Sequence, residues 1–84
     1  MKRIYFSHHV LQRMIERGTN RREVEEAIQR GRQVPAKEGK TAFRLNLRFE
    51  QTWKSKYYGT KQVMAIVSEK PDCYVVVTVL TFYF

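Results

Sequence analysis

The chain has 84 residues, 43% of them hydrophobic, and its 16 basic and 8 acidic side chains give a formal net charge of +8. A chain this short buries only about 60–65% of its unfolded surface, so we expect a single domain over residues 1–84, and the apolar content excludes a disordered protein. Because Cys73 is the one cysteine in the sequence, an internal disulfide framework is excluded and we expect a cytoplasmic protein.

The positive charge is concentrated between residues 40 and 61. Such an excess favours a polyanionic partner, either a nucleic acid or an acidic protein, because binding releases counterions. The N-terminal residues lack the long apolar core of a signal peptide, and the apolar run of residues 73–84 is too short to span a bilayer. We therefore expect neither targeting nor contact with a membrane.

The first predicted elements are a short strand and a helix. Residues 3–6 alternate and are rich in strand-forming types. The next segment predicts a helix over residues 8–17, with Ser7 as its N-cap and Gly18 as its stop. At 100° per residue, its apolar side chains fall within roughly 140° of one another. They are Val10, Leu11, Met14 and Ile15.

A second helix is predicted between Asn20 and Gly31. Asn20 and Glu23 have the spacing of a capping box, in which each residue caps the main chain of the other. The buried stripe of this helix consists of Val24, Ala27 and Ile28.

After Gly31 the hydrophobic period changes from 3.6 to 2, which predicts a sheet. Residues 32–35 read as a short edge strand closed by proline, and residues 36–40 as a turn. Residues 43–50 alternate between an apolar face and a basic one. Residues 51–61 mix strand-forming and polar types, which predicts a strand extension followed by a loop.

Residues 62–68 and 73–83 are mostly apolar and predict a hairpin joined by the sequence EKPD. The expected fold is therefore α+β: a short N-terminal strand, two helices, then a mainly antiparallel sheet of about four strands with the helices packed on one face.

The last strand is apolar on both faces. Simple alternation places Tyr74, Val76, Thr78, Leu80 and Phe82 on one face, and Val75, Val77, Val79, Thr81 and Tyr83 on the other. Two short helices cover only one face of a sheet, so residues 80–84 need another cover, either the segment of residues 53–58 or a second copy of the chain. We expect a weak homodimer.

His9, Arg13 and Arg17 recur every four residues and therefore lie in one row on the first helix. Groups that are or can be positive repel one another unless an anion offsets them, so the row is a candidate phosphate site. The alternative is an ordinary solvated helix face. His8 points about 100° away from His9. Two histidines and one distant cysteine do not supply the ligands of a zinc site, so we expect no metal and no cofactor.

A second candidate set interleaves basic and aromatic side chains. This pattern suits RNA, because cations meet phosphates and rings stack on unpaired bases. Its members are Arg44, Arg48, Lys54, Lys56, Tyr57 and Tyr58. Trp53 is a further candidate, with packing of the sheet against the helices as the alternative. For Arg44 and Arg48 the alternative is a solvent-facing strand.

The motif HxxxRMxxRG of residues 9–18, followed by a capped second helix, resembles the small bacterial and phage family known as domain of unknown function 4258. Residues 75–80 also resemble the final strand of that family, whereas residues 32–62 match only in pattern. Val10 stands where the family commonly has alanine, and Thr19 where it commonly has isoleucine. The family in turn resembles the RelE/ParE-type toxin superfamily, whose ribonuclease members pack N-terminal helices on an antiparallel sheet.

This resemblance implies a toxin-like ribonuclease that cuts RNA by attack of the 2′-hydroxyl on the adjacent phosphate, without a metal. In that hypothesis His9 is the general acid or base, and Arg13 and Arg17 hold the phosphate. The basic residues of the second set follow the RNA backbone. The alternative is a non-catalytic module that binds nucleic acid or protein through the same charges. An acidic, antitoxin-like protein is the partner expected of a toxin-like chain.

Overall fold

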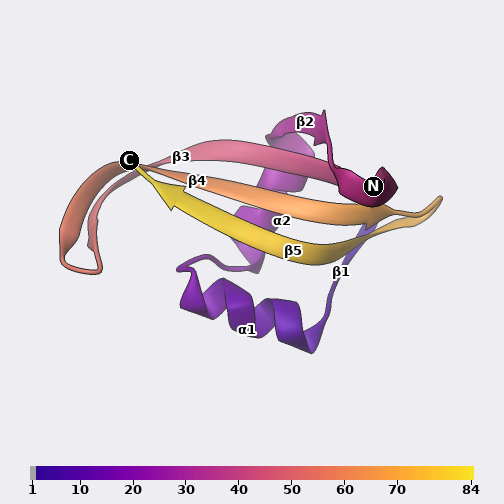
Figure 1. Cartoon of the computed structure of the whole chain (residues 1–84), viewed down its shortest axis with the longest axis horizontal. Helices are drawn as coiled ribbons and strands as arrows, with labels where there is room; N and C mark the ends of the chain where they lie inside the picture. Colours follow the sequence, from indigo (N-terminus) through magenta and orange to yellow (C-terminus); the bar gives the residue numbers. More distant parts are fainter. Residues whose placement is uncertain (1) are drawn as a thin grey trace.

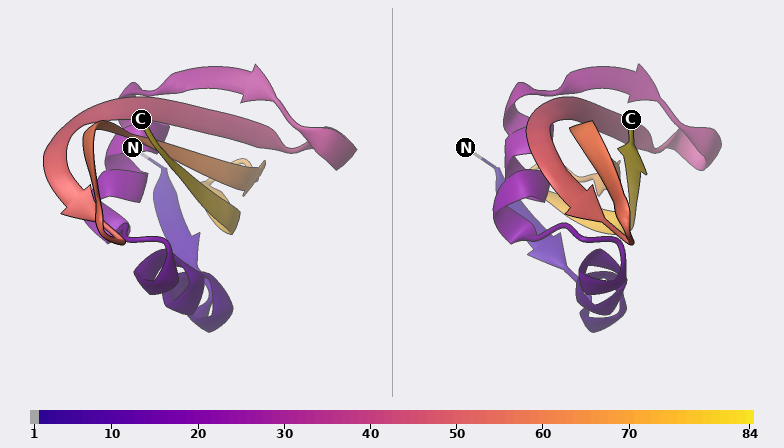
Figure 2. Two further views of the ribbon diagram at one scale, coloured as in Figure 1. Left: turned by 60° about the vertical axis from the view of Figure 1, so that its left-hand side comes forward. Right: turned by 90° about the vertical axis from the view of Figure 1, so that its left-hand side faces the viewer.

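In a computed structural model that describes residues 2–84, the chain forms two helices and a five-stranded sheet (Figure 1). Both helices contribute to one core on the same face of the sheet (Figure 2), so the predicted α+β arrangement is confirmed. In chain order the elements are β1 (Arg3–Phe6), α1 (His8–Glu16), α2 (Arg21–Arg30), β2 (Arg32–Pro35), the 3₁₀ turn η1 (Lys37–Gly39), β3 (Thr41–Trp53), β4 (Lys56–Glu69) and β5 (Cys73–Tyr83).

The sheet is mixed, with strand order β1-β5-β4-β3-β2. Its neighbouring strands are antiparallel, except that β1 runs parallel to β5 from Arg3 opposite Cys73 to Phe6 opposite Val76. The mainly antiparallel sheet is thus confirmed, and the opening strand adds one parallel pair. Because β1 ends at Phe6, the same edge of β5 has no strand partner beyond Val76 within residues 2–84.

The β3–β4 hairpin is longer than the sequence indicates. The predicted strand extension in residues 51–61 is confirmed, but the predicted loop is wrong, because only Lys54 and Ser55 separate the two strands. Their φ angles are 50° and 71°, and such positive angles give a two-residue turn the twist that a hairpin requires. A register shift near Glu50 accompanies the bend by which the tip of the hairpin curls back toward the helices (Figure 2).

The core fills the space between the helices and one face of the sheet. Fully burying an aliphatic side chain contributes about 1.5–3 kcal/mol, so this layer supplies most of the hydrophobic stabilisation of a small domain. All three residues of the predicted α2 stripe belong to it. The buried residues of this cluster are Val10, Met14, Val24, Ala27, Ile28, Phe43, Val63, Ala65, Val67, Val76 and Val79.

A bulge in β5 changes which of its side chains face the helices. Ile66 pairs with Thr78 but Val67 pairs with Val76, which leaves Val77 as an extra residue. The helix-facing residues are therefore Tyr74, Val76, Val79, Thr81 and Tyr83. The strict alternation predicted for this strand is wrong beyond Val76, because one inserted residue exchanges the two faces.

Candidate functional site

The row of His9, Arg13 and Arg17 lies along the solvent-accessible side of α1. The helix begins at Ser7, whose Oγ accepts a hydrogen bond from the Val10 N–H at 3.1 Å. Val10 is buried, whereas His9 and Arg13 are exposed and Arg17 is half-buried. The row therefore borders the apolar face of α1 without being buried in it.

These three side chains line one groove, of about 210 Å³, between α1 and β5. The other residues that line it are Val10 of α1 and Val77, Thr78 and Val79 of β5. This is the stretch of β5 that follows the end of β1, so its edge is open where α1 runs beside it (Figure 1). His8 and His9 are both exposed, but of the two only His9 lines the groove.

The groove carries an excess of positive charge. Arg13 Nη1 lies 3.6 Å from Glu16 Oε1, and since both side chains are about half exposed, this pair contributes less than about 0.5 kcal/mol. Each guanidinium offers a planar fork that binds a phosphate through two hydrogen bonds. An imidazole can accept or donate a proton near neutral pH. The three groups together suit an anionic ligand on which proton transfer is required.

The end of α1 that carries Arg17 is fixed by a Schellman motif. The Gly18 N–H donates to Ile15 O at 3.2 Å, and the Thr19 N–H donates to Met14 O at 2.9 Å. Gly18 adopts the left-handed conformation that this motif requires, with a φ of 77°. The helix stop predicted at Gly18 is confirmed.

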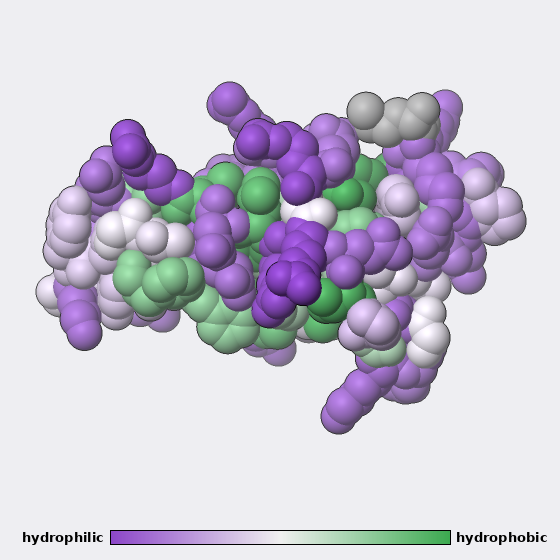
Figure 3. All heavy atoms as spheres, turned by 90° about the horizontal axis from the view of Figure 1, so that it is seen from above, coloured by the Kyte–Doolittle hydropathy of each residue, from purple (hydrophilic) through white to green (hydrophobic). Residues whose placement is uncertain are grey.

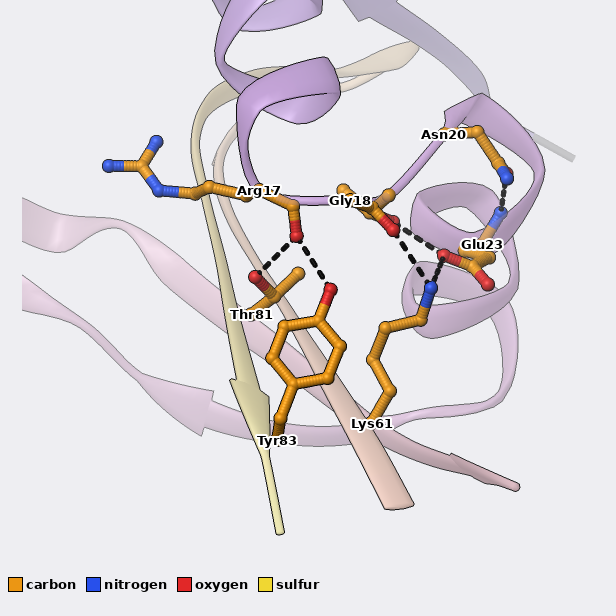
Figure 4. A network of polar contacts seen from close by, with 8 residues as sticks. Arg17, Gly18, Asn20, Glu23, Lys61, Thr81 and Tyr83 are labelled. Atoms are coloured by element: carbon orange, nitrogen blue, oxygen red, sulfur yellow. Dashed lines mark hydrogen bonds and ion pairs between the residues drawn. The ribbon is translucent and has the colours of Figure 1, made fainter. Parts of the chain in front are cut away.

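Three side chains of the sheet hold the main chain at this corner (Figure 4). Arg17 O accepts hydrogen bonds from Thr81 Oγ1 and Tyr83 Oη, each at 2.8 Å. Lys61 Nζ donates to Gly18 O at 2.9 Å. The guanidinium of Arg17 points away from these contacts (Figure 4), so the sheet fixes the main chain while the charged group faces the groove.

Lys61 is a buried cation, 5% exposed, that sequence reasoning missed. Its Nζ lies 2.8 Å from Glu23 Oε1, which also accepts a hydrogen bond from Thr19 Oγ1 at 2.8 Å. Asn20 Oδ1 accepts from the Glu23 N–H at 2.9 Å. The Asn20 half of the predicted capping box is therefore confirmed, whereas the Glu23 carboxylate compensates the buried ammonium group.

An aromatic cluster covers Tyr83. Its ring stacks on Trp53, with centroids 5.2 Å apart and an interplanar angle of 17°, and it also contacts Phe49 and Tyr58. Burial raises the pKa of the Tyr83 phenol above its ordinary value. Trp53 thus packs the sheet against the α1–α2 corner, as in the alternative given for it, and the hairpin tip covers the helix-facing end of β5.

The structure separates the second predicted set into two groups. Arg44 and Arg48 lie on the sheet face opposite the helices, paired with the outward-facing positions Met64 and Thr60 of β4. Arg32, which the sequence pattern did not single out, pairs directly with Arg44. The tip of the hairpin carries the other four residues, Lys54, Lys56, Tyr57 and Tyr58.

No group of three or more His, Cys, Asp or Glu side chains among residues 2–84 is placed to hold a metal ion. Within the same residues, neither helix has the length and apolar character needed to cross a membrane.

Comparison with curated proteins and with solved structures gives no match. Comparison with protein families gives one: the family described as Domain of unknown function (DUF4258) matches residues 6–81. The match spans both helices, the groove residues His9, Arg13 and Arg17, and Lys61. Because it extends over most of the sequence, the chain belongs to the DUF4258 family.

Proposed function

We propose that the chain cuts RNA in the groove between α1 and β5, in a reaction that needs no metal ion. The 2′-oxygen of a ribose attacks the adjacent phosphorus, and the bond from phosphorus to the 5′-oxygen breaks. The products are a 2′,3′-cyclic phosphate and a free 5′-hydroxyl. His9 accepts the proton of the 2′-hydroxyl as general base, and the departing 5′-oxygen takes a proton from water.

Arg13 and Arg17 bind the scissile phosphate in this proposal. Negative charge grows on the phosphate oxygens as the 2′-oxygen attacks, and fixed guanidinium groups stabilise that charge more than the charge of the ground state. The contacts of Thr81, Tyr83 and Lys61 at the end of α1 hold the main chain of Arg17 in place. The sheet therefore fixes the main chain from which the Arg17 side chain extends.

One observation carries the proposal: a histidine and two arginines line one groove beside an open strand edge. The net charge of +8 supports a polyanionic substrate. The resemblance of the HxxxRMxxRG family to RelE/ParE-type toxins supports RNA as that substrate and cleavage as the activity.

A module that binds RNA without cutting it is the second candidate. It is favoured by the lining of the groove, in which His9 is accompanied by valines, arginines and one threonine. None of those partners transfers protons readily near neutral pH. Both candidates predict RNA binding that weakens steeply with added salt, so the two differ in cleavage alone.

The test is single-turnover cleavage of end-labelled single-stranded RNAs in the presence of EDTA, with and without ribosomes. His9→Ala is expected to lower the cleavage rate by about 10²–10⁴-fold while RNA affinity stays nearly unchanged. His8→Ala is the matched control, because His8 is the adjacent exposed histidine and does not line the groove. Arg13→Lys should also slow cleavage, because lysine lacks the two-pronged fork.

The products identify the mechanism, since a 2′,3′-cyclic phosphate is diagnostic of attack by the 2′-oxygen. If the wild-type protein binds every RNA and cuts none, the binding module is the correct function. If His8→Ala and His9→Ala lose cleavage equally, the groove is not where the reaction takes place.

A further inference from the structure

The face of the sheet that no helix covers has an ordered arrangement of charge and apolar surface. Every second residue of β4 from Lys61 to Val67 is buried against the helices. Gln62, Met64 and Ile66 therefore project from the opposite face. Residues directly paired across strands lie on the same face. The strand register therefore assigns the neighbours of these three side chains.

Two rows cross this open face from β3 to β5. In the first, Arg44 is paired with Met64, which is paired with Leu80. In the second, Asn46 is paired with Gln62, which is paired with Phe82. Adjacent strands lie about 4.8 Å apart, so each row passes from a polar end to an apolar end in about 10 Å. The polar ends lie on β3 and the apolar ends on β5.

The polar side of the open face is hollow and basic. A depression of about 470 Å³ is lined by Arg32, Arg44, Leu45, Asn46 and Gln62. Gln62 Nε2 donates to Asn46 Oδ1 at 2.9 Å, so an amide pair lies beside the two arginines. Exposed apolar surface lies among projecting hydrophilic side chains when the molecule is viewed from the side of β2 and β3 (Figure 3).

The apolar side of the open face leads to the groove of α1. A second depression, of about 620 Å³, is lined by Met64, Ile66, Val77 and Thr78 together with the segment of residues 34–40, which includes Lys37, Glu38 and Lys40. Val77 and Thr78 also line the groove of His9, Arg13 and Arg17. The two hollows therefore meet at the bulge of β5, around the open edge of the strand.

We infer that the open face binds single-stranded RNA, with phosphates on Arg44 and Arg48 and unpaired bases on Met64, Leu80 and Phe82. The strand of RNA then passes over Val77 and Thr78 and delivers its next phosphate to the groove of α1. This inference rests on the proposed function, because it takes RNA as the ligand, and it adds the requirement that the RNA be unpaired. Base recognition on a sheet through apolar side chains and cations needs splayed bases, which a duplex does not offer.

The charge and polarity of the rows favour RNA over an acidic amphipathic helix. Arginines alone would suit either ligand. The amide pair of Asn46 and Gln62 lies between Arg44 and Phe82, where a helix would place its apolar stripe. The edges of bases carry hydrogen-bond donors and acceptors that match a side-chain amide. A nucleotide can therefore bind both the polar and the apolar side chains of this row.

The experiment measures the binding of fluorescein-labelled 12-nucleotide 2′-O-methyl RNAs by anisotropy, so that cleavage plays no part. The probes are a single strand, its duplex with the complement, and an equally charged strand of abasic nucleotides. We expect the single strand to bind at least about 10-fold more tightly than either of the others. Phe82→Ala should weaken binding of the single strand by about 5-fold or more and leave binding of the abasic strand unchanged.

Two variants separate recognition from folding. Phe82→Tyr keeps an aromatic ring and should restore binding if the ring stacks on a base. Arg44→Gln should weaken binding of all three probes. It should also reduce the slope of the logarithm of affinity against the logarithm of salt concentration by about 1, the value for one lost phosphate contact.

Equal binding of the single strand and the duplex, or of the intact and abasic strands, would overturn the inference. So would a Phe82→Ala variant that binds as wild type, tighter binding of poly-glutamate than of RNA, or dimerisation that Phe82→Ala abolishes. Cleavage is measured separately. If the protein binds RNA as expected but never cuts it, the proposed reaction is wrong and the open face remains an RNA-binding site.

Discussion

The two faces of the sheet are built from alternate residues of the same strands, yet they differ in burial, charge and hydrogen bonding. On β4, Val63 is 0% exposed beneath the helices, whereas its neighbour Met64 is half-buried on the open face. The closed face contains a buried cation, Lys61, whose charge is compensated by Glu23. The open face presents Arg44 and Arg48 to solvent without a helix above them.

This difference shows how a very small domain separates stability from ligand binding. The helices and the curled hairpin complete one face, and every buried side-chain nitrogen or oxygen in residues 2–84 has a hydrogen-bond partner. Cations and apolar side chains that contribute little to the core remain on the other face and at the open edge of β5. A ligand can therefore be recognised without any change to the packed layer.

The largest expected effect is that of Gly18→Ala on the closed face. A Cβ at Gly18 would lie 2.5 Å from Tyr83 Oη and 2.7 Å from Trp53 Cη2, and the φ of 77° strains any residue with a side chain. We expect a loss of about 3 kcal/mol in the free energy of unfolding, measured by urea denaturation.

Two other glycines separate the causes of that loss. Gly39 has a φ of 71° but open space around it, so Gly39→Ala should lose only about 1 kcal/mol from backbone strain. Gly59 has open space and no positive φ, so Gly59→Ala should lose nothing. If Gly18→Ala costs no more than Gly39→Ala, the contacts with Tyr83 and Trp53 do not hold this corner.

The second prediction compares adjacent residues on the two faces. Val63→Ala removes buried methyl groups and should lower the free energy of unfolding by about 2 kcal/mol. Met64→Ala removes a larger side chain from the open face and should cost less than about 1 kcal/mol. Both are measured by urea denaturation at two protein concentrations. Equal losses, or a Met64→Ala loss that grows with concentration, would show that a second copy covers the open face.

The smallest effect concerns Tyr83 at high pH. Burial raises the pKa of Tyr83 in the folded state, so the unfolded state loses this proton first as the pH rises past 10.0. The contribution of Tyr83 to the free energy of unfolding is therefore fully present below pH 10 and falls as the pH rises further. Tyr83→Phe should reduce that fall and cost about 1 kcal/mol at pH 7, because Arg17 O loses one of its two donors.

Lys2 requires a control in the same experiment. Its hydrogen bond with Glu69 raises the pKa of Lys2 above 10.5, so its contribution is also lost as the pH rises. Measuring the free energy of unfolding of Lys2→Met between pH 9 and 11 separates the contribution of Lys2 from that of Tyr83. A pH dependence that is the same in wild type and Tyr83→Phe contradicts the role assigned to the buried phenol.

The helices and their ends could be predicted from the sequence because their signals are local. The Ser7 and Asn20 caps and the glycine stop after α1 each depend on residues within one turn. The row of groove side chains followed from helical spacing for the same reason. The opposite wall of the groove did not, since it comes from residues about 65 positions later in the chain.

Features that depend on how strands far apart in the sequence pair with one another were not predicted. The bulge at Val77 leaves no mark in a run of apolar residues, so alternation misassigned the end of β5. Lys61 has the same parity as Val63 and so lies on the buried face, but its compensation by Glu23 is visible only in three dimensions. The pairing of Arg32 with Arg44 likewise requires the register of β2 on β3.

The central claim is that RNA binds the open edge and open face of the sheet, and nuclear magnetic resonance of the ¹⁵N-labelled protein tests it most directly. Titration with the non-cleavable single-stranded 2′-O-methyl RNA is expected to shift the amide signals of residues 9–17, residues 77–82 and the open-face positions of β3 and β4. The buried amides of α2 should remain unchanged. Shifts confined to the hairpin tip at residues 53–58, or no shifts at saturating RNA, would contradict this account.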